Sequence, residues 1–177
     1  MKSNSEIKNI AASVLTQEAT ALNKLSERIG DDFVSVVHAI LELKGRVVLT
    51  GVGKSAIIAQ KIVATLNSTG TPAIFMHAAD AIHGDLGIIQ ADDLVMAVSK
   101  SGNTAEIKVL VPLLRQTENQ LVAVVGNTDS YLAQQADYLL DTAVEKEACP
   151  HNLAPTTSTT AQLAMGDALA ICLLECR

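Results

Sequence analysis

The first part of the chain carries apolar residues at helical spacing. Residues 5–28 place their apolar side chains on one side of a helix and leave a polar face opposite. A second helix is predicted over residues 31–43, with Asp31 or Asp32 as its N-cap and Gly45 as its stop. These two helices precede the first strand, so they are expected to cover a sheet or a subunit interface.

The pattern then changes to short runs of Val, Ile, Leu and Ala separated by helical segments. The predicted strands are residues 46–50, 72–76, 93–99, 120–125 and 138–141. Such alternation predicts an α/β fold with a doubly wound, mainly five-stranded parallel sheet flanked by helices. We interpret residues 1–177 as a single domain, with residues 1–44 forming N-terminal helices that pack on it. Ligands of such sheets bind beyond the C-terminal ends of the strands.

Composition narrows the function. The net charge is −6 and aromatic residues make up 2% of the chain, which argues against a nucleic-acid partner. The N-terminus has no apolar signal region, and residues 161–176 are too polar and too few for a membrane span. The odd number of cysteines, three, favours reduced thiols. We therefore expect a cytoplasmic protein without a membrane partner.

The first loop with chemical potential is Gly51-Val-Gly-Lys-Ser55, between a strand and a helix. Its glycines permit close backbone approach to an anion at the helix start, which makes Gly53, Lys54 and Ser55 candidate site residues. A Walker P-loop is excluded because Val48 stands where its first glycine belongs. A dinucleotide-binding loop is a weaker alternative, since no acidic residue ends the second strand, and so is a plain tight turn.

Two further loops are rich in hydroxyl groups. The segment 99–104 contains Ser99, Ser101 and Thr104 around Gly102, and residues 156–160 are five consecutive Ser or Thr residues. One helix cap needs one hydroxyl. The surplus suits the oxygens of a terminal phosphate, although surface turns rich in Ser and Thr remain the alternative.

Ionisable candidates are few. His77 and His83 follow the second strand, Glu106 lies one turn into the helix after the first hydroxyl loop, and Glu147 precedes the second. Each also has an ordinary structural explanation, such as a favourable carboxylate at a helix N-terminus for Glu106 or an exposed loop charge for Glu147.

Six motifs occur in an order that resembles the SIS (sugar isomerase) domain of arabinose 5-phosphate isomerases. They are Gly51-Val-Gly-Lys-Ser55, Ser68-Thr-Gly-Thr-Pro72, His83-Gly-Asp-Leu-Gly87, Ser99-x-Ser101-Gly102, Glu147-Ala-Cys-Pro150 and Leu153-Ala-Pro-Thr-Thr-Ser-Thr-Thr160. The resemblance implies a flavodoxin-like sheet. It also implies interconversion of ribulose 5-phosphate and arabinose 5-phosphate through an enediolate, for synthesis of the lipopolysaccharide sugar Kdo. The family resembled forms homotetramers with active sites at subunit contacts.

The same resemblance assigns residues. It implies catalytic roles for Lys54, His83, Glu106 and Glu147, with either glutamate as the base, and an inhibitory zinc ion at His77 without any required cofactor. The substrate-binding residues implied or predicted are Gly53, Ser55, Gly70, Thr71, Ser99, Ser101, Gly102, Asn103, Thr104, Thr157 and Ser158.

The chain lacks two features that are common in the family resembled. A His-Pro-Gly-Gly segment and paired CBS domains would follow Arg177, so we expect a short form without CBS domains. Two alternatives stay open. One is another isomerase of this type, acting on a hexulose or heptose phosphate, and the other is a non-catalytic regulatory domain that binds a sugar phosphate.

Overall fold

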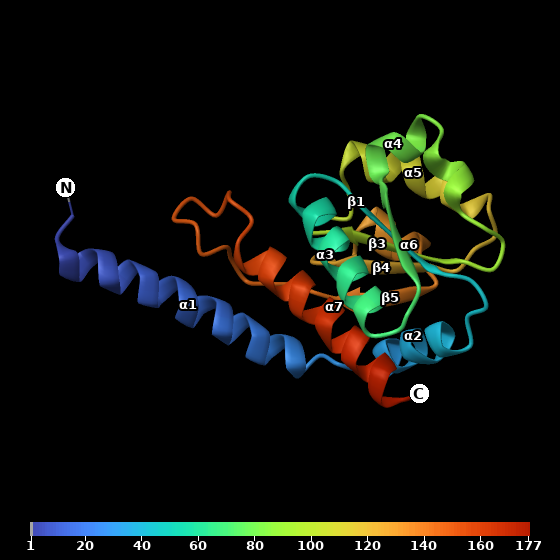
Figure 1. The fold of residues 1–177 in the computed structure, drawn as a ribbon. Coiled ribbons are helices and arrows are strands. Elements are labelled where there is room, and N and C mark those ends of the chain that lie inside the picture. Colours follow the sequence, from blue (N-terminus) through green and yellow to red (C-terminus); the bar gives the residue numbers. More distant parts are fainter. Residues whose placement is uncertain (1) are drawn as a thin grey trace.

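The fold is a parallel sheet between two layers of helices, with one helix projecting from it (Figure 1). A computed structural model describes residues 2–177. The strands are β1 (Val47–Gly51), β2 (Ala73–His77), β3 (Leu94–Ser99), β4 (Leu121–Val125) and β5 (Tyr138–Asp141). The helices are α1 (Asn4–Ser26), α2 (Asp31–Leu41), α3 (Lys54–Ser68), α4 (Ala78–Ile82), the 3-10 helix η1 (Asp85–Ile88), α5 (Ala105–Arg115), α6 (Tyr131–Gln135) and α7 (Thr157–Glu175).

All five strands are parallel, in the order β2-β1-β3-β4-β5. The inner strands β1, β3 and β4 are buried along their whole length, as expected for strands covered on both faces. The order reverses between β1 and β3, which is the switch point where this topology binds ligands. The predicted doubly wound, flavodoxin-like sheet is confirmed.

Alternate strand residues enter two separate cores. Val47 and Leu49 face a core formed with α2, α3 and α7, whereas Val48 faces a core formed with α4, α5 and α6. The helices α3 and α7 cross closely, because a Cβ atom on Gly166 would lie 2.4 Å from a carbon of Ile62. This crossing holds the N-terminal ends of both helices at the same edge of the sheet.

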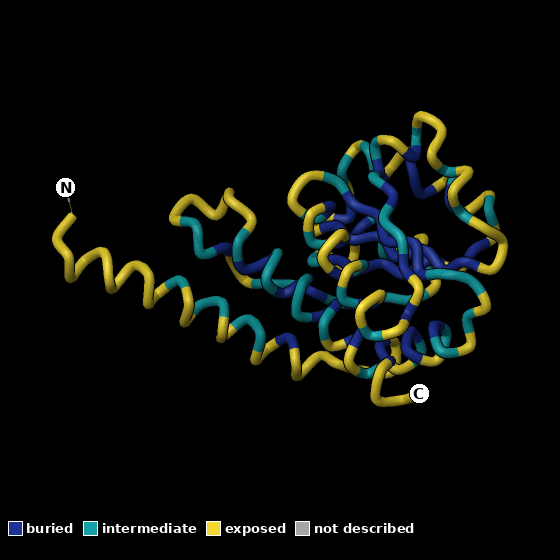
Figure 2. The backbone as a smooth tube through the Cα atoms, in the orientation of Figure 1, coloured by how far each residue is buried: buried dark blue, intermediate teal, exposed yellow. Residues whose placement is uncertain are grey.

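The helix α1 differs from the others. Leu25 is its one buried residue, and its N-terminal half is exposed along its length (Figure 2). Its C-terminal part packs on α7 and makes an ion pair from Lys24 to Glu145, and Arg28, just after the helix, pairs with Asp141. Ile7 and Leu15 leave 55% and 68% of their surface exposed. The expectation that this helix covers a subunit interface stays a prediction.

Two sequence expectations need correction at the second helix. Neither Asp31 nor Asp32 caps α2, because its N-cap is Gly30 and both acids lie in the first turn, where they still face the positive end of the helix dipole. Gly45 does not stop the helix, which ends at Leu41. Its role is close packing, since a Cβ atom there would lie 2.3 Å from the carbonyl oxygen of Asp92.

Candidate functional site

The predicted loops meet at the edge formed by the C-terminal ends of the strands. A cavity of about 370 Å³ lies there, between the loops that follow β3, β4 and β5 and the start of α7. Its walls are formed by Lys100, Ser101, Gly126, Asn127, Thr142, Val144, Ser158 and Gln162. The two hydroxyl-rich segments of the sequence therefore share one cavity, through Ser101 and Ser158.

The loop of residues 99–104 is folded so that its hydroxyl groups accept backbone hydrogen bonds. Ser99 Oγ accepts from the Gly102 N–H at 3.0 Å, and Ser101 Oγ accepts from the Asn103 N–H at 3.2 Å. Ser101 is exposed and lines the cavity, so its hydroxyl hydrogen is left to donate outward, whereas Ser99 is buried and does not line the cavity. Gly102 has φ 61°, and a Cβ atom there would lie 2.1 Å from Ser130 Oγ, so the turn requires glycine. Thr104 caps α5 by accepting from the Ile107 N–H.

The N-terminus of α7 is already occupied by a carboxylate of the same chain. Glu147 Oε2 accepts from the N–H groups of Thr156 at 2.9 Å and Ser158 at 3.1 Å. The Ser158 hydroxyl donates to Oε1 and the Thr156 hydroxyl to Oε2. Of the five hydroxyl residues that the sequence offered for a phosphate at this helix, Thr156 and Ser158 thus bind Glu147, and the hydroxyls of Thr159 and Thr160 donate to the carbonyl oxygen of Thr156.

Lys100 completes this arrangement. Its Nζ lies 2.7 Å from Glu147 Oε1, and the carboxylate side chain is fully buried while the lysine side chain is 46% exposed. Burial by itself would raise the pKa of Glu147, but Lys100, Ser158 and the N–H groups of Thr156 and Ser158 outweigh it and lower the pKa to about 2. Glu147 is therefore ionised at neutral pH and a weak proton acceptor.

The loop after β1 reaches the cavity through one hydrogen bond. Gly53, with φ 59°, is the N-cap of α3, and this helix start has no side-chain cap. Ser55 Oγ donates to Gln162 Oε1 at 3.3 Å, and Gln162 is a buried wall residue of the cavity. Lys54 is exposed beside this link and does not line the cavity within one chain.

The remaining predicted residues lie apart. Glu106 is half-buried in the first turn of α5, and His83 is exposed at the C-terminal end of α4; neither lines the cavity. Gly70 and Thr71 precede β2, at the opposite edge of the sheet, where Thr71 Oγ1 accepts a hydrogen bond from Arg177. One chain does not bring these two residues to the cavity, so their assignment stays a prediction that requires a neighbouring subunit.

The predicted metal residue has a structural role in this chain. His77 caps α4, with its Nδ1 accepting from the Ala79 N–H at 3.3 Å. Within residues 2–177, no three His, Cys, Asp or Glu side chains are grouped closely enough to hold a metal ion. The residues present therefore do not form a zinc site within one chain, and a zinc ion at His77 would need ligands from elsewhere.

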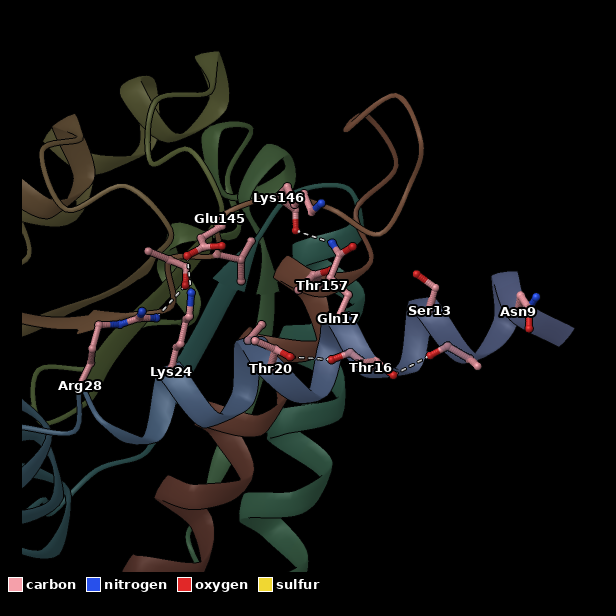
Figure 3. A pocket seen from close by; sticks show the side chains of 14 residues that line it. Asn9, Ser13, Thr16, Gln17, Thr20, Lys24, Arg28, Glu145, Lys146 and Thr157 are labelled. Atoms are coloured by element: carbon pink, nitrogen blue, oxygen red, sulfur yellow. Dashed lines mark hydrogen bonds and ion pairs between the residues drawn. The ribbon is translucent and has the colours of Figure 1, made fainter. Parts of the chain in front are cut away.

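Thr157 and its neighbour Ser158 line different hollows. The Thr157 side chain lines a larger hollow of about 720 Å³ between α1 and residues 143–146 instead of the cavity at the strand ends. Figure 3 shows this hollow, where Gln17 of α1 donates to the carbonyl oxygen of Lys146 at 3.1 Å. Thr157 Oγ1 is buried without a partner among the residues that the structure describes. Its predicted contact with a phosphate is not supported by this placement.

Six of the eight residues that line the cavity were missed by sequence reasoning: Lys100, Gly126, Asn127, Thr142, Val144 and Gln162. Lys100 lies within the loop of residues 99–104, but a lysine in a loop gives no sign in the sequence of the residue with which it pairs. Thr142 and Gln162 carry no motif, and only the position of Gln162 on an apolar helix marked it as unusual.

Comparisons with known proteins agree with this geometry. The SIS domain family matches residues 40–172. Arabinose 5-phosphate isomerase KdsD of Pseudomonas aeruginosa is 50% identical over all of this chain and 54% of its own length. Arabinose 5-phosphate isomerase GutQ of Escherichia coli K12 is 46% identical over 96% of this chain and 53% of its own length. The chain spans about half the length of these curated relatives.

A solved structure matches almost end to end. The structure of the E. coli CFT073 protein c3406 in complex with arabinose 5-phosphate has a TM-score of 0.95 and 36% identity, covering 99% of this chain and 93% of that chain. Because this likeness includes both the helices and the sheet, it extends over the cavity as well as the core.

Proposed function

Because this chain belongs to the SIS domain family, we propose that it is an aldose–ketose isomerase that interconverts ribulose 5-phosphate and arabinose 5-phosphate. The observation that carries the proposal is the cavity at the strand ends, where Ser101 and Lys100 offer donors to a phosphate. The names of the relatives KdsD and GutQ and the sugar-phosphate complex of c3406 support the choice of substrate.

The substrate phosphate is proposed to bind the loop of residues 99–104. Its oxygens would receive the hydroxyl hydrogen of Ser101 and N–H groups at the start of α5, as anions do at helix N-termini. The buried Ser99 is proposed to support this site by holding the Gly102 N–H. Ser55, at the neighbouring start of α3, is proposed to complete this ring of neutral donors with its backbone N–H, because its hydroxyl already donates to Gln162.

The reaction moves a proton between C1 and C2 through an enediolate, which needs a carboxylate base and a donor for the oxyanion. The two candidate glutamates differ. Glu147 is buried, bound by several donors and has a pKa of about 2, so it would accept a proton poorly. We therefore favour Glu106 as the base and assign Glu147 to holding the start of α7 and Lys100 in place.

Lys54 is proposed to stabilise the oxyanion, and His83 to move the hydroxyl proton or assist ring opening. Because one chain leaves Lys54, His83 and Glu106 outside the cavity, the complete site is proposed to form between subunits of a homotetramer, with the exposed apolar side of α1 in the contacts. The proton transfer requires no organic cofactor or metal ion, and zinc is proposed only as an inhibitor at His77.

The cellular role proposed is supply of arabinose 5-phosphate for Kdo and lipopolysaccharide synthesis in the cytoplasm. None of the helices within residues 2–177 is both long enough and apolar enough to cross a membrane.

The direct test is incubation of the purified protein with ribulose 5-phosphate and chromatographic detection of arabinose 5-phosphate. Hexulose 6-phosphate and heptulose 7-phosphate serve as parallel substrates. Formation of arabinose 5-phosphate with the largest kcat/KM supports the proposal. Turnover of a longer sugar phosphate alone, or binding of sugar phosphates without any turnover, would replace it with one of the two alternatives.

A further inference from the structure

The cavity at the strand ends has one charged wall residue. Among the eight residues that line it, Lys100 is the only one that carries a charge. Gly126, Val144 and the polar amides and hydroxyls around it are neutral. A dianionic phosphate that enters this cavity therefore meets a single cationic lining residue. Lys100 is the sequence neighbour of Ser101, whose hydroxyl also faces the cavity.

Lys100 is also the most exposed partner of Glu147. The carboxylate keeps two backbone N–H donors and two hydroxyl donors from Thr156 and Ser158 whether or not Lys100 contacts it. The lysine side chain is 46% exposed, and its ammonium group has three donors, of which Glu147 Oε1 takes one. The other two donors are available to a second anion.

We propose that Lys100 is the counter-ion of the substrate phosphate and that Glu147 positions it for this purpose. The inference rests on the proposed function, because it takes the phosphate end of the substrate to bind at residues 99–104. In this arrangement the buried carboxylate holds the ammonium group at the wall of the cavity. The phosphate then contacts the side of the ammonium group that faces away from Glu147, so that Lys100 lies between the two anions.

The pairing explains why a protein with a net charge of −6 can hold a phosphorylated sugar. Neutral donors in the loop orient the phosphate. Lys100 supplies the positive charge, because the other residues that line the cavity are neutral. A charge-assisted hydrogen bond is about twice as strong as a neutral one. Affinity for the phosphate end should therefore depend on Lys100 more than on any single neutral wall residue.

The experiment measures binding of inorganic phosphate by calorimetry, alongside KM and kcat for arabinose 5-phosphate. The variants are Lys100→Met, Lys100→Arg and, as a matched control, Lys108→Met, whose exposed side chain lies on α5 outside the cavity. Lys100→Met should weaken phosphate binding and raise KM by about tenfold, with kcat changed less than about twofold. Lys100→Arg should restore most of the affinity, and Lys108→Met should behave as the wild type.

The outcomes separate the inference from the proposed function. Wild-type phosphate affinity in Lys100→Met, with the protein folded by circular dichroism, overturns the inference even if the wild type isomerises its substrate. Lys100-dependent phosphate binding in a wild type that turns over no sugar phosphate keeps the inference and removes the proposed reaction. If Lys100→Met does not fold, Lys100→Gln provides the same comparison, and equal loss in Lys108→Met would also overturn the inference.

Discussion

Two helices of this fold begin beside clusters of hydroxyl side chains, yet their N-termini have different uses. At α5, the exposed Ser101 accepts a hydrogen bond from the Asn103 N–H and keeps its hydroxyl hydrogen free. At α7, the donors of Thr156 and Ser158 are spent on the buried carboxylate of Glu147. One helix start is open to an external anion and the other holds an internal one.

This difference shows that a donor-rich helix start is not by itself a phosphate site. An N-terminus satisfied by a carboxylate of its own chain gains stability, because the positive end of the helix dipole and the N–H groups are paired. An open start keeps those groups for a ligand. We therefore predict that substitutions at α7 lower stability, whereas substitutions at the loop of residues 99–104 lower substrate affinity.

The largest effect is expected for Glu147→Gln. The substitution removes the charge that four donors and Lys100 surround, and leaves Lys100 without its partner. We expect a loss of about 3 kcal/mol in the free energy of unfolding, measured by urea denaturation. The matched control is Glu106→Gln, in the first turn of α5, which should lose turnover while its unfolding free energy changes by less than about 1 kcal/mol. Equal stability of the two variants would contradict the difference between the two helix starts.

The dependence of the unfolding free energy on pH in the acid range tests the same carboxylate without removing it. The pKa of Glu147 falls from its ordinary 4.5 to about 2 on folding. Its contribution is therefore complete above pH 4.5 and is lost as the pH falls through 2, amounting to about 3 kcal/mol. Because Glu147 becomes protonated in this range, the difference in unfolding free energy between wild type and Glu147→Gln should shrink between about pH 5 and pH 2. Asp93 also has a lowered pKa, since its bonds to Arg46 and backbone N–H groups outweigh the effect of burial, but it is present in both proteins that are compared. A constant difference would show that Glu147 is not held ionised by its partners.

A matched serine pair separates the two helix starts. Ser158→Ala removes a buried donor to Glu147 and should lower the unfolding free energy by about 1–2 kcal/mol, with KM nearly unchanged. Ser101→Ala removes an exposed hydroxyl and should raise KM about threefold, less than the loss of Lys100, while stability changes little. Thermal unfolding and steady-state kinetics on both variants measure the four quantities. The reverse pattern, with Ser158 controlling KM, would show that α7 binds the phosphate.

The smallest effect is expected for Thr157→Val. The hydroxyl of Thr157 is buried without a partner among residues 2–177, so its removal should change the unfolding free energy by less than about 1 kcal/mol, in the stabilising direction. KM should stay at the wild-type value, because the side chain lies in the hollow beside α1 and not in the cavity. A severalfold rise in KM would restore Thr157 as a phosphate contact.

The strands were predictable from sequence because they are short, largely apolar runs, which are buried on both faces in β1, β3 and β4. Each strand boundary lies within one residue of the structure. The short helices α4, η1 and α6 were not predicted. Five residues or fewer are too short to show a period of 3.6. The caps of α2 were missed because two neighbouring aspartates suit a cap and a first turn equally well.

The site was predictable only in part. The loops that follow parallel strands must share one edge, so the proximity of Ser101 and Ser158 follows from the fold. The pairing of Lys100 with Glu147 does not follow, since it depends on the directions of two side chains in irregular segments. The sequence shows hydroxyl donors at the starts of both α5 and α7. It does not show that the donors at α7 are already bound to Glu147.

The most direct measurement is a crystal structure of the protein with arabinose 5-phosphate bound. We predict that the phosphate lies against Ser101 and the backbone N–H groups of the loop at residues 99–104, with Lys100 in contact and Glu147 still bound to the N–H groups of Thr156 and Ser158. A phosphate at the start of α7, with Glu147 displaced from those groups, would contradict this assignment of the two helix starts.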